Sequence, residues 1–262
     1  MLPDLVNPKE RTYLTIALIV SGFIYFSLLI SLIGIFYLLI AAAALAFAQG
    51  IAIGHLRGNG IRVSERQFPD VMRIARQVCS QLAIAEVPPI YIVQSGGVLN
   101  AFATRFFGRN YVCIYSDILE LAYEHGEAEV AFILAHELTH VARKHVWWKA
   151  VITPATLIPF LGSAYSRACE YTCDAYGAYL WPQGAEGGIL VLAAGKRLYR
   201  EMDVEAFLAQ AREPDTFFMW LAEHVATHPN LPKRLSMVRY FTASRAGAPV
   251  AAPGAPSVIS TT

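Results

Sequence analysis

Hydrophobic residues are concentrated near the start of the chain. No Asp, Glu, Lys, Arg or His occurs from Thr12 to Gly54, a run of 43 residues. One membrane-spanning helix needs about 20 apolar residues, so this run is long enough for two spans. The sequence SLIG at 31–34 is the least strongly apolar part of the run and marks the expected turn. The pattern therefore predicts a transmembrane hairpin over residues 12–54, with one long tilted helix as the alternative.

A signal peptide is a second alternative for this run, because Ala46-Phe47-Ala48 resembles a cleavage site. The apolar region of a signal peptide has only about 7–15 residues, so a retained hairpin fits better. Basic residues tend to stay in the cytoplasm, and two spans place both flanks on one side. We therefore expect an integral, multi-pass membrane protein whose downstream domain is cytoplasmic. The flanking basic residues are Lys9, Arg11, Arg57, Arg62 and Arg66.

Beyond the hairpin, a segment with helical spacing of its apolar residues is followed by short β-rich runs and then by further helical segments. Short β-rich runs separated by glycine-containing turns predict a small sheet. The expected fold class is α+β, mainly α-helical, with an N-terminal transmembrane hairpin and a small β-sheet. The predicted strands are 90–93, 98–104 and 111–115. The predicted helices are 64–85, 127–145, 165–180, 187–200 and several pieces within 201–240, broken by Pro214 and Pro229.

The composition of the chain argues against a typical soluble domain and against a nucleic-acid-binding protein. Hydrophobic residues make up 55% of the chain and charged residues 16%, which is more apolar than a typical soluble domain. The net charge is +1 and no basic cluster with interleaved aromatic residues occurs, so no nucleic-acid partner is expected. Residues 243–262 lack a core-forming pattern and are expected to be disordered. Cys169 and Cys173 are one helical turn apart and could bind metal, but we interpret them as small, half-buried residues.

The candidate chemistry lies in the apolar helix predicted at 127–145, which contains the sequence HELTH. His136 and His140 are four residues apart, so their imidazoles share one helix face, with Cβ atoms roughly 5–6 Å apart. Two nitrogen ligands at this spacing can bind one Zn²⁺. Glu137 lies beside them, where it can take a proton from zinc-bound water. Ionisable residues in so apolar a helix are costly unless they are paired or bind metal, which favours zinc over a chance match.

A catalytic zinc ion needs a third protein ligand and one position open to water. Glu170 and Asp174 are four residues apart on the next predicted helix, whose Ala, Cys and Tyr residues favour burial. One carboxylate can bind zinc, and the other can accept a hydrogen bond from a ligand histidine. The alternative is a solvated acidic face in which Arg167 pairs with one of them.

These motifs together resemble the M48 metallopeptidases, which include HtpX-type membrane proteases and CAAX prenyl proteases. The matching sequences are HELTH at 136–140, SRACEYTCD at 166–174, THP at 227–229 and NAFA at 100–103. The resemblance implies a zincin-type catalytic domain over 62–240 and one Zn²⁺ per chain. It implies that His136, His140 and Glu170 bind zinc and that Glu137 is the general base. Asp174 would orient a ligand histidine, Arg167 would hold the helix that carries Glu170, and His228 would stabilise the oxyanion. Substrates would be aligned on an edge strand by Asn100, Ala101 and Phe102.

The resemblance implies a membrane-bound zinc endopeptidase that acts on misfolded or membrane proteins in quality control. The alternative is a non-enzymatic membrane protein with a structural metal site, or a module that binds extended peptides. A CAAX-type processing enzyme is less favoured, because a chain with one hairpin is too short to build a large membrane chamber.

The segment 146–165 departs from the HtpX pattern, which usually has membrane spans at this place. The segment is apolar and about long enough for one span. One span would separate Glu170 from His140, so we expect a re-entrant loop, an interfacial segment or a cover over the domain. On a continuous helix, His145 would face away from the site. Two further histidines, His55 and His125, are expected at the surface.

Overall fold

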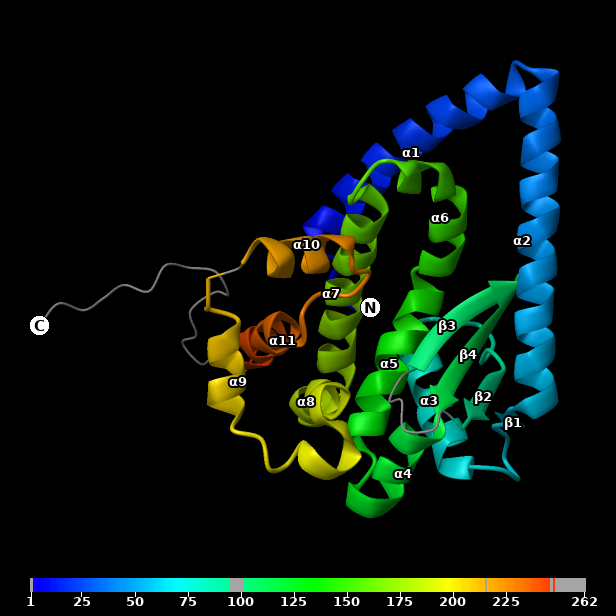
Figure 1. Cartoon of the computed structure of the whole chain (residues 1–262). Helices are drawn as coiled ribbons and strands as arrows, with labels where there is room; N and C mark the ends of the chain where they lie inside the picture. The colour runs from blue at the N-terminus through cyan, green and yellow to red at the C-terminus, as the bar shows by residue number, and fades with distance from the viewer. Residues whose placement is uncertain (1, 95–100, 215, 246, 248–262) are drawn as a thin grey trace, which may run out of the picture.

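This computed structural model describes residues 2–94, 101–214, 216–245 and 247, without the side chains of 122–125. Figure 1 shows a mainly helical α+β fold with a small sheet, as predicted. The α-helices are α1 (Pro8–Leu29), α2 (Leu32–Asn59), α3 (Pro69–Gln81), α4 (Ser116–His125), α5 (Ala128–Ala142), α6 (His145–Val151), α7 (Leu161–Leu180), α8 (Pro182–Leu198), α9 (Val204–Gln210), α10 (Phe217–Val225) and α11 (Leu231–Arg245). A 3-10 helix, η1 (Thr153–Leu157), follows α6, and the strands are β1 (Ile61–Arg62), β2 (Ile90–Val93), β3 (Ala101–Phe106) and β4 (Arg109–Tyr115).

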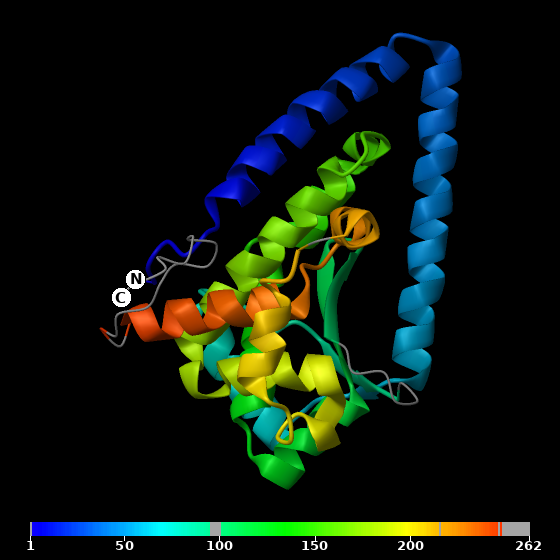
Figure 2. The same cartoon turned by 60° about the vertical axis from the view of Figure 1, so that its left-hand side comes forward.

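The predicted N-terminal hairpin is present as α1 and α2. The chain turns at Ile30 and Ser31, and the Ser31 hydroxyl accepts a hydrogen bond from the backbone N–H of Gly34. Both helices are long and apolar enough to cross a membrane, and only 11% and 6% of their most apolar windows are buried. The helices diverge from the turn and form an arch over the rest of the chain (Figure 2).

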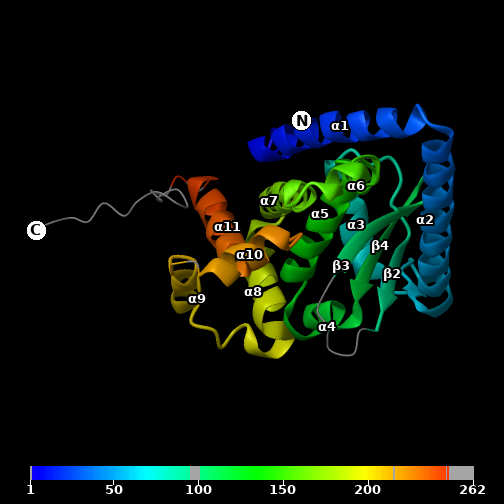
Figure 3. The same ribbon diagram turned by 45° about the horizontal axis from the view of Figure 1, so that its top comes forward.

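The sheet separates the end of α2 from the main core. Its strand order is β1-β2-β4-β3, with β2 parallel to β4 and the other pairs antiparallel. Successive side chains of a strand point to opposite faces, and the two faces have different partners. Ile90, Ile92, Val112 and Ile114 belong to the main core, whereas Tyr91, Tyr111 and Cys113 pack against Ile53 and Leu56 of α2. Figure 3 shows α2 beyond one face of the sheet and α5 beyond the other.

Helix α5 lies at the centre of the main core, as its all-round apolar sequence predicts. Every residue from Val130 to Val141 is buried. Glycines allow α8 to approach α5 closely: a Cβ atom added at Gly188 would lie 2.4 Å from the Phe132 ring. Because α7 and α8 both pack on α5, a side chain on α7 can reach the HELTH residues.

The segment 146–165 forms α6, η1 and the first turn of α7 rather than one straight span. It packs along α1, where the backbone N–H of Ala155 donates to the Ser21 hydroxyl at 3.1 Å. Ile152, Ala155 and Tyr165 are buried together with Ala17 of α1. The segment 146–165 therefore covers part of the domain and joins it to the first apolar helix, α1.

Several boundaries differ from the sequence prediction. Helix α3 is shorter than the predicted 64–85, and α7 begins four residues before 165. Helix α11 continues to Arg245, so the first residues of the predicted tail are helical. Apart from Gly247, the rest of that tail lies outside the described residues, as do residues 98–100 of the second predicted strand.

Candidate metal centre

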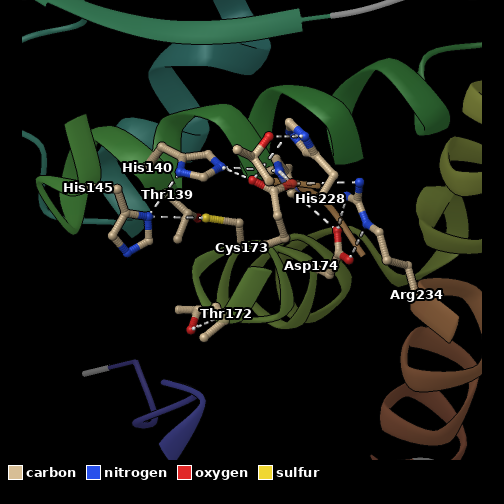
Figure 4. A network of polar contacts seen from close by, with 12 residues as sticks. Thr139, His140, His145, Thr172, Cys173, Asp174, His228 and Arg234 are labelled. Atoms are coloured by element: carbon tan, nitrogen blue, oxygen red, sulfur yellow. Dashed lines mark hydrogen bonds and ion pairs between the residues drawn. The ribbon is translucent and has the colours of Figure 1, made fainter. Parts of the chain in front are cut away.

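Two histidines of α5 and one carboxylate of α7 converge at the centre of the molecule (Figure 4). The Nε2 atoms of His136 and His140 lie 3.3 Å apart. The Glu170 carboxylate lies 3.4 Å from Nε2 of His136 and 3.3 Å from Nε2 of His140. All three residues are buried, with exposed fractions of 8% or less. The structure thus brings together the three residues that the sequence predicts as zinc ligands.

This triangle fits a tetrahedral zinc ion. Nitrogen and oxygen ligands bind zinc at about 2.0–2.2 Å, which places two ligands of a tetrahedron about 3.3–3.5 Å apart. Burial raises the pKa of the Glu170 carboxyl, but its contacts with His136 and His140 hold this pKa well below the usual value. The ligand carboxylate is therefore ionised, as metal binding requires.

Cys173 is a rival third ligand. One atom each of His136, His140 and Cys173 lies within 4.8 Å of the others. A thiol must lose its proton to bind zinc, and burial raises the pKa of Cys173 well above its usual value. The Cys173 sulfur lies 3.7 Å from Nδ1 of His145, away from the Nε2 atoms that face Glu170. Glu170 therefore fits the metal centre better than Cys173 does.

Asp174 fixes the orientation of His136. Its Oδ1 atom lies 2.9 Å from Nδ1 of His136, which leaves Nε2 available for a metal. Arg234 of α11 donates to both oxygens of Asp174, at 2.8 and 2.7 Å, and its Nη1 lies 3.6 Å from Glu170. This arginine is 4% exposed. The pairing of Arg167 with an acidic residue, considered from the sequence, is replaced by this pairing with Arg234.

Glu137 faces a small cavity next to the ligands. The side chain is buried, and burial raises its pKa to about 6. The cavity has a volume of about 50 Å³. One water molecule occupies about 30 Å³ in the liquid, so the cavity has room for a water beside the carboxylate. It is lined by Ala101, Phe132, Ile133, His136, Glu137, Glu170, Leu192, His228 and Arg234.

His228 lies at the exposed edge of this cavity. Its Nε2 atom is 3.6 Å from Glu170, and 63% of its side chain is exposed. His224, four residues earlier in the sequence, instead stacks on Trp220 with ring centroids 4.3 Å apart. Arg167 donates to the backbone carbonyls of Glu223, His224 and Ala226 at 2.8–2.9 Å. Arg167 therefore holds the end of α10, from which the chain continues to His228.

The predicted substrate residues lie at the start of β3, the last strand of the sheet order. Ala101 lines the cavity that contains Glu137. Phe102 points to the other face of the sheet, where it packs against Tyr115 and is 38% exposed. Asn100 lies outside the described residues.

His145 does not face away from the site, so the prediction made from a continuous helix is wrong. Helix α5 ends at Ala142, and Lys144 adopts a left-handed conformation with φ 58° and ψ 31°. This bend turns His145 back toward α5, so that its Nδ1 atom lies 2.9 Å from Nδ1 of His140. Its Nε2 atom lies 3.3 Å from Glu10 of α1. Burial lowers the pKa of His145 to about 4, which keeps it neutral near pH 7.

Fold and site together define a protein in which an HExxH motif on one helix and a carboxylate on a second, packed helix form a group that could hold a metal ion. The sequence model of peptidase family M48 matches residues 65–158 and 148–242, and the chain belongs to that family. Protease HtpX homolog 1 of Streptomyces coelicolor is 32% identical over 173 residues, covering 62% of this chain and 51% of that protein.

Two further relatives are peptidases that are not named as HtpX homologues. Plastoglobule-localized metallopeptidase 48 of Arabidopsis thaliana is 28% identical over 177 residues, covering 60% of this chain and 50% of that protein. Beta-barrel assembly-enhancing protease of Yersinia pestis is 25% identical over 224 residues, covering 76% of this chain and 45% of that protein. This chain therefore spans about half the length of these curated relatives. No solved structure gives a significant match.

Proposed function

We propose that this protein is a membrane-bound, zinc-dependent endopeptidase in which Glu137 is the general base. The observation that carries the proposal is the convergence of His136, His140 and Glu170 beside a buried glutamate. The two imidazoles and the carboxylate supply three ligands, which leaves one position of a tetrahedral zinc ion for water or substrate. A site with only a structural metal has no use for a carboxylate base next to an open position.

The residues of the site divide the reaction between them. A bound zinc ion would polarise the substrate carbonyl and lower the pKa of a water molecule. Glu137 takes the proton from this water and passes it to the amine that leaves. His228, at the cavity edge, donates a hydrogen bond to the oxyanion of the tetrahedral intermediate. Asp174 holds His136 in the tautomer that presents Nε2 to the metal.

Substrates bind in extended form along β3. A strand at the end of a sheet can pair with an added peptide through its main-chain groups. Ala101 lies next to the cavity of Glu137, so a peptide paired there places its backbone close to the base. Asn100 and Phe102 flank this position in the sequence. One relative is named for enhancing beta-barrel assembly, and we extend this link with protein assembly to misfolded or membrane polypeptides as the substrates.

Removal of the metal is expected to abolish the cleavage of an unfolded protein such as casein. Detergent-purified protein is treated with a zinc chelator, and cleavage is measured before and after stoichiometric Zn²⁺ is returned. Cleavage should fall to the background rate and recover with Zn²⁺, because the metal polarises the carbonyl and activates the water. Cleavage that persists in protein shown to contain no metal would contradict the proposal.

Helices α1 and α2 anchor the protein in the bilayer, with the catalytic domain on the cytoplasmic side of a bacterial inner membrane. Only 11% and 6% of their apolar windows are buried, and basic residues lie at both outer ends. A second apolar surface continues toward the lipid from this anchor. It consists of residues of η1, the following turn and α10, namely Leu157, Ile158, Phe160, Phe217, Phe218, Met219 and Trp220. The Phe160 and Trp220 rings lie 5.7 Å apart, which joins the two parts of this surface.

A bromine-lipid quenching experiment tests this placement. The native cysteines are buried, so a fluorophore can be attached selectively to Phe218→Cys or to the control Gln210→Cys. In liposomes that contain brominated phospholipids, the fluorophore at 218 should be quenched and the one at 210 should not. In intact bacterial cells, a membrane-impermeant maleimide should label Gln210→Cys only after lysis. Equal quenching at both positions, or labelling before lysis, would contradict this arrangement.

A further inference from the structure

We propose that Glu10 of α1 positions the zinc ligand His140 through His145, so that the first apolar helix contributes a side chain to the metal centre. This inference rests on the proposed zinc site. The contacts form one chain: Glu10 Oε1 lies 3.3 Å from Nε2 of His145, and Nδ1 of His145 lies 2.9 Å from Nδ1 of His140. Figure 4 shows His145 beside His140, on the side opposite Asp174.

The environment of Glu10 shows that its carboxylate is held in place. Glu10 is 3% exposed, on a helix whose other buried residues are Ala17 and Ser21. A buried carboxylate is costly unless it is hydrogen-bonded or paired. The Thr172 hydroxyl donates to one oxygen of Glu10, and Arg143 donates to the other at 3.3 Å. Glu10 is thus fixed by α7 and by the end of α5, the same two helices that carry the metal ligands.

The direction of the hydrogen bonds follows from the metal site. Nε2 of His140 faces Glu170 and His136, so it is the metal-binding atom and Nδ1 carries the proton. Nδ1 of His140 therefore donates to Nδ1 of His145. Because Nδ1 of His145 accepts this hydrogen bond, Nε2 of His145 carries the proton and donates to Glu10. A carboxylate oriented through an imidazole thus serves one ligand histidine, while Asp174 serves the other directly.

Two other interpretations of the contacts around Glu10 and His145 fit the structure less well. One is a second metal site, and the other is a set of contacts that only holds α1 against α7. Glu10, His145 and Cys169 lie close enough to hold a metal ion. However, both ring nitrogens of His145 already have partners, and the Arg143 guanidinium supplies the positive charge beside Glu10. Contacts that only hold α1 against α7 are unnecessary, because other bonds hold this segment to α7. The backbone N–H groups of Leu5 and Asn7 donate to the Tyr176 and Thr172 hydroxyls.

The test measures zinc affinity in the full-length protein, independently of proteolysis. Changes in groups that orient a metal ligand typically weaken metal binding about 10–100-fold. Glu10→Gln should therefore raise the zinc dissociation constant, measured by chelator competition in detergent, by about 10–100-fold. The control is Asp4→Asn, which removes a carboxylate from the same segment but affects only exposed contacts, with Arg11 and with the backbone N–H of Val6. The control should bind zinc as the wild type does.

A double-mutant comparison separates positioning from an unrelated effect. His145→Phe should weaken zinc binding, and adding Glu10→Gln to it should cause little further loss. The absorption bands of Co²⁺-substituted protein should change in both single variants, because the orientation of a ligand imidazole changes. Wild-type zinc affinity in Glu10→Gln, or losses that multiply in the double variant, would overturn the inference. A wild-type protein that binds no zinc would instead overturn the proposed function.

Folding of the variants is checked by thermal unfolding of the metal-free protein. If Glu10→Gln does not fold, two variants at the middle of the chain of contacts decide the question. His145→Gln keeps a hydrogen-bond donor and an acceptor, whereas His145→Phe keeps neither. His145→Gln should retain more zinc affinity than His145→Phe. Equal zinc affinity in these two folded variants would overturn the inference.

Discussion

Glu137→Gln is expected to abolish peptide-bond cleavage while leaving the metal bound. Glutamine has nearly the same size as glutamate, so the buried position next to the cavity stays filled. It cannot accept a proton from water, and general acid–base catalysis typically contributes about 10²–10⁴-fold to the rate. Glu137 is not among the three converging ligands, so zinc binding should persist. We therefore expect kcat/KM to fall by about 10²–10⁴-fold at an unchanged zinc content.

The measurement compares casein cleavage and zinc content in detergent-purified wild type and variants. Glu129→Gln is the matched control, because Glu129 is also on α5 but contacts the Tyr199 hydroxyl at 3.4 Å. The control should cut as the wild type does. Zinc in both proteins with cleavage only in the wild type would support the catalytic role. Undiminished cleavage by Glu137→Gln would rule out Glu137 as the general base.

The parts of the fold that sequence predicted well depend on local patterns. Helix α5 was recognisable because its apolar residues surround the whole helix, and all twelve residues from Val130 to Val141 are buried. Strand β2 has the predicted bounds because two prolines precede a short run of β-branched and aromatic residues and two glycines follow it. The turn of the hairpin falls at Ser31, at the start of the predicted 31–34. In each case, the signal is contained within a few consecutive residues.

The sequence predicted the site residues that lie four positions apart on one helix. It did not predict the position of a residue beyond the end of that helix. His136 and His140 on one helix, and Glu170 and Asp174 on another, follow from a spacing of four residues. His145 was misplaced because nothing in the sequence requires a left-handed residue at Lys144. A single deviating residue redirects every side chain that follows it.

Long-range partners are the other part that sequence reasoning missed. Arg234 is 60 residues from Asp174, and Glu10 is 135 residues from His145. Their neighbours Lys233 and Lys9 are also charged, so no local feature identifies Arg234 and Glu10 as the buried residues. Glu10 does carry one signal: it is an acidic residue two positions before a long apolar run. Only the packing of α1 and α11 on α7 gives these residues their role.

The second prediction with a large expected effect concerns which residue is the third metal ligand. Glu170→Ala should lose zinc, whereas Cys173→Ser should keep it. The Glu170 oxygens lie 3.3–3.4 Å from both Nε2 atoms, so removal of the carboxylate leaves a site with only two protein ligands. The loss of affinity should exceed the loss of about 10–100-fold that is typical of groups that only orient a ligand. Serine at 173 removes the sulfur and leaves the histidines and the carboxylate unchanged.

Chelator competition and metal analysis on both full-length variants distinguish the two ligand sets. Burial keeps the Cys173 thiol protonated, and its sulfur contacts His145, so the structure gives it no position among the ligands. Loss of zinc in Cys173→Ser with retention in Glu170→Ala would instead indicate a centre of two histidines and a cysteine. In that centre Glu170 would be a free acid next to Glu137, and either carboxylate could serve as the base. The ligand assignment therefore also determines which carboxylate is available for catalysis.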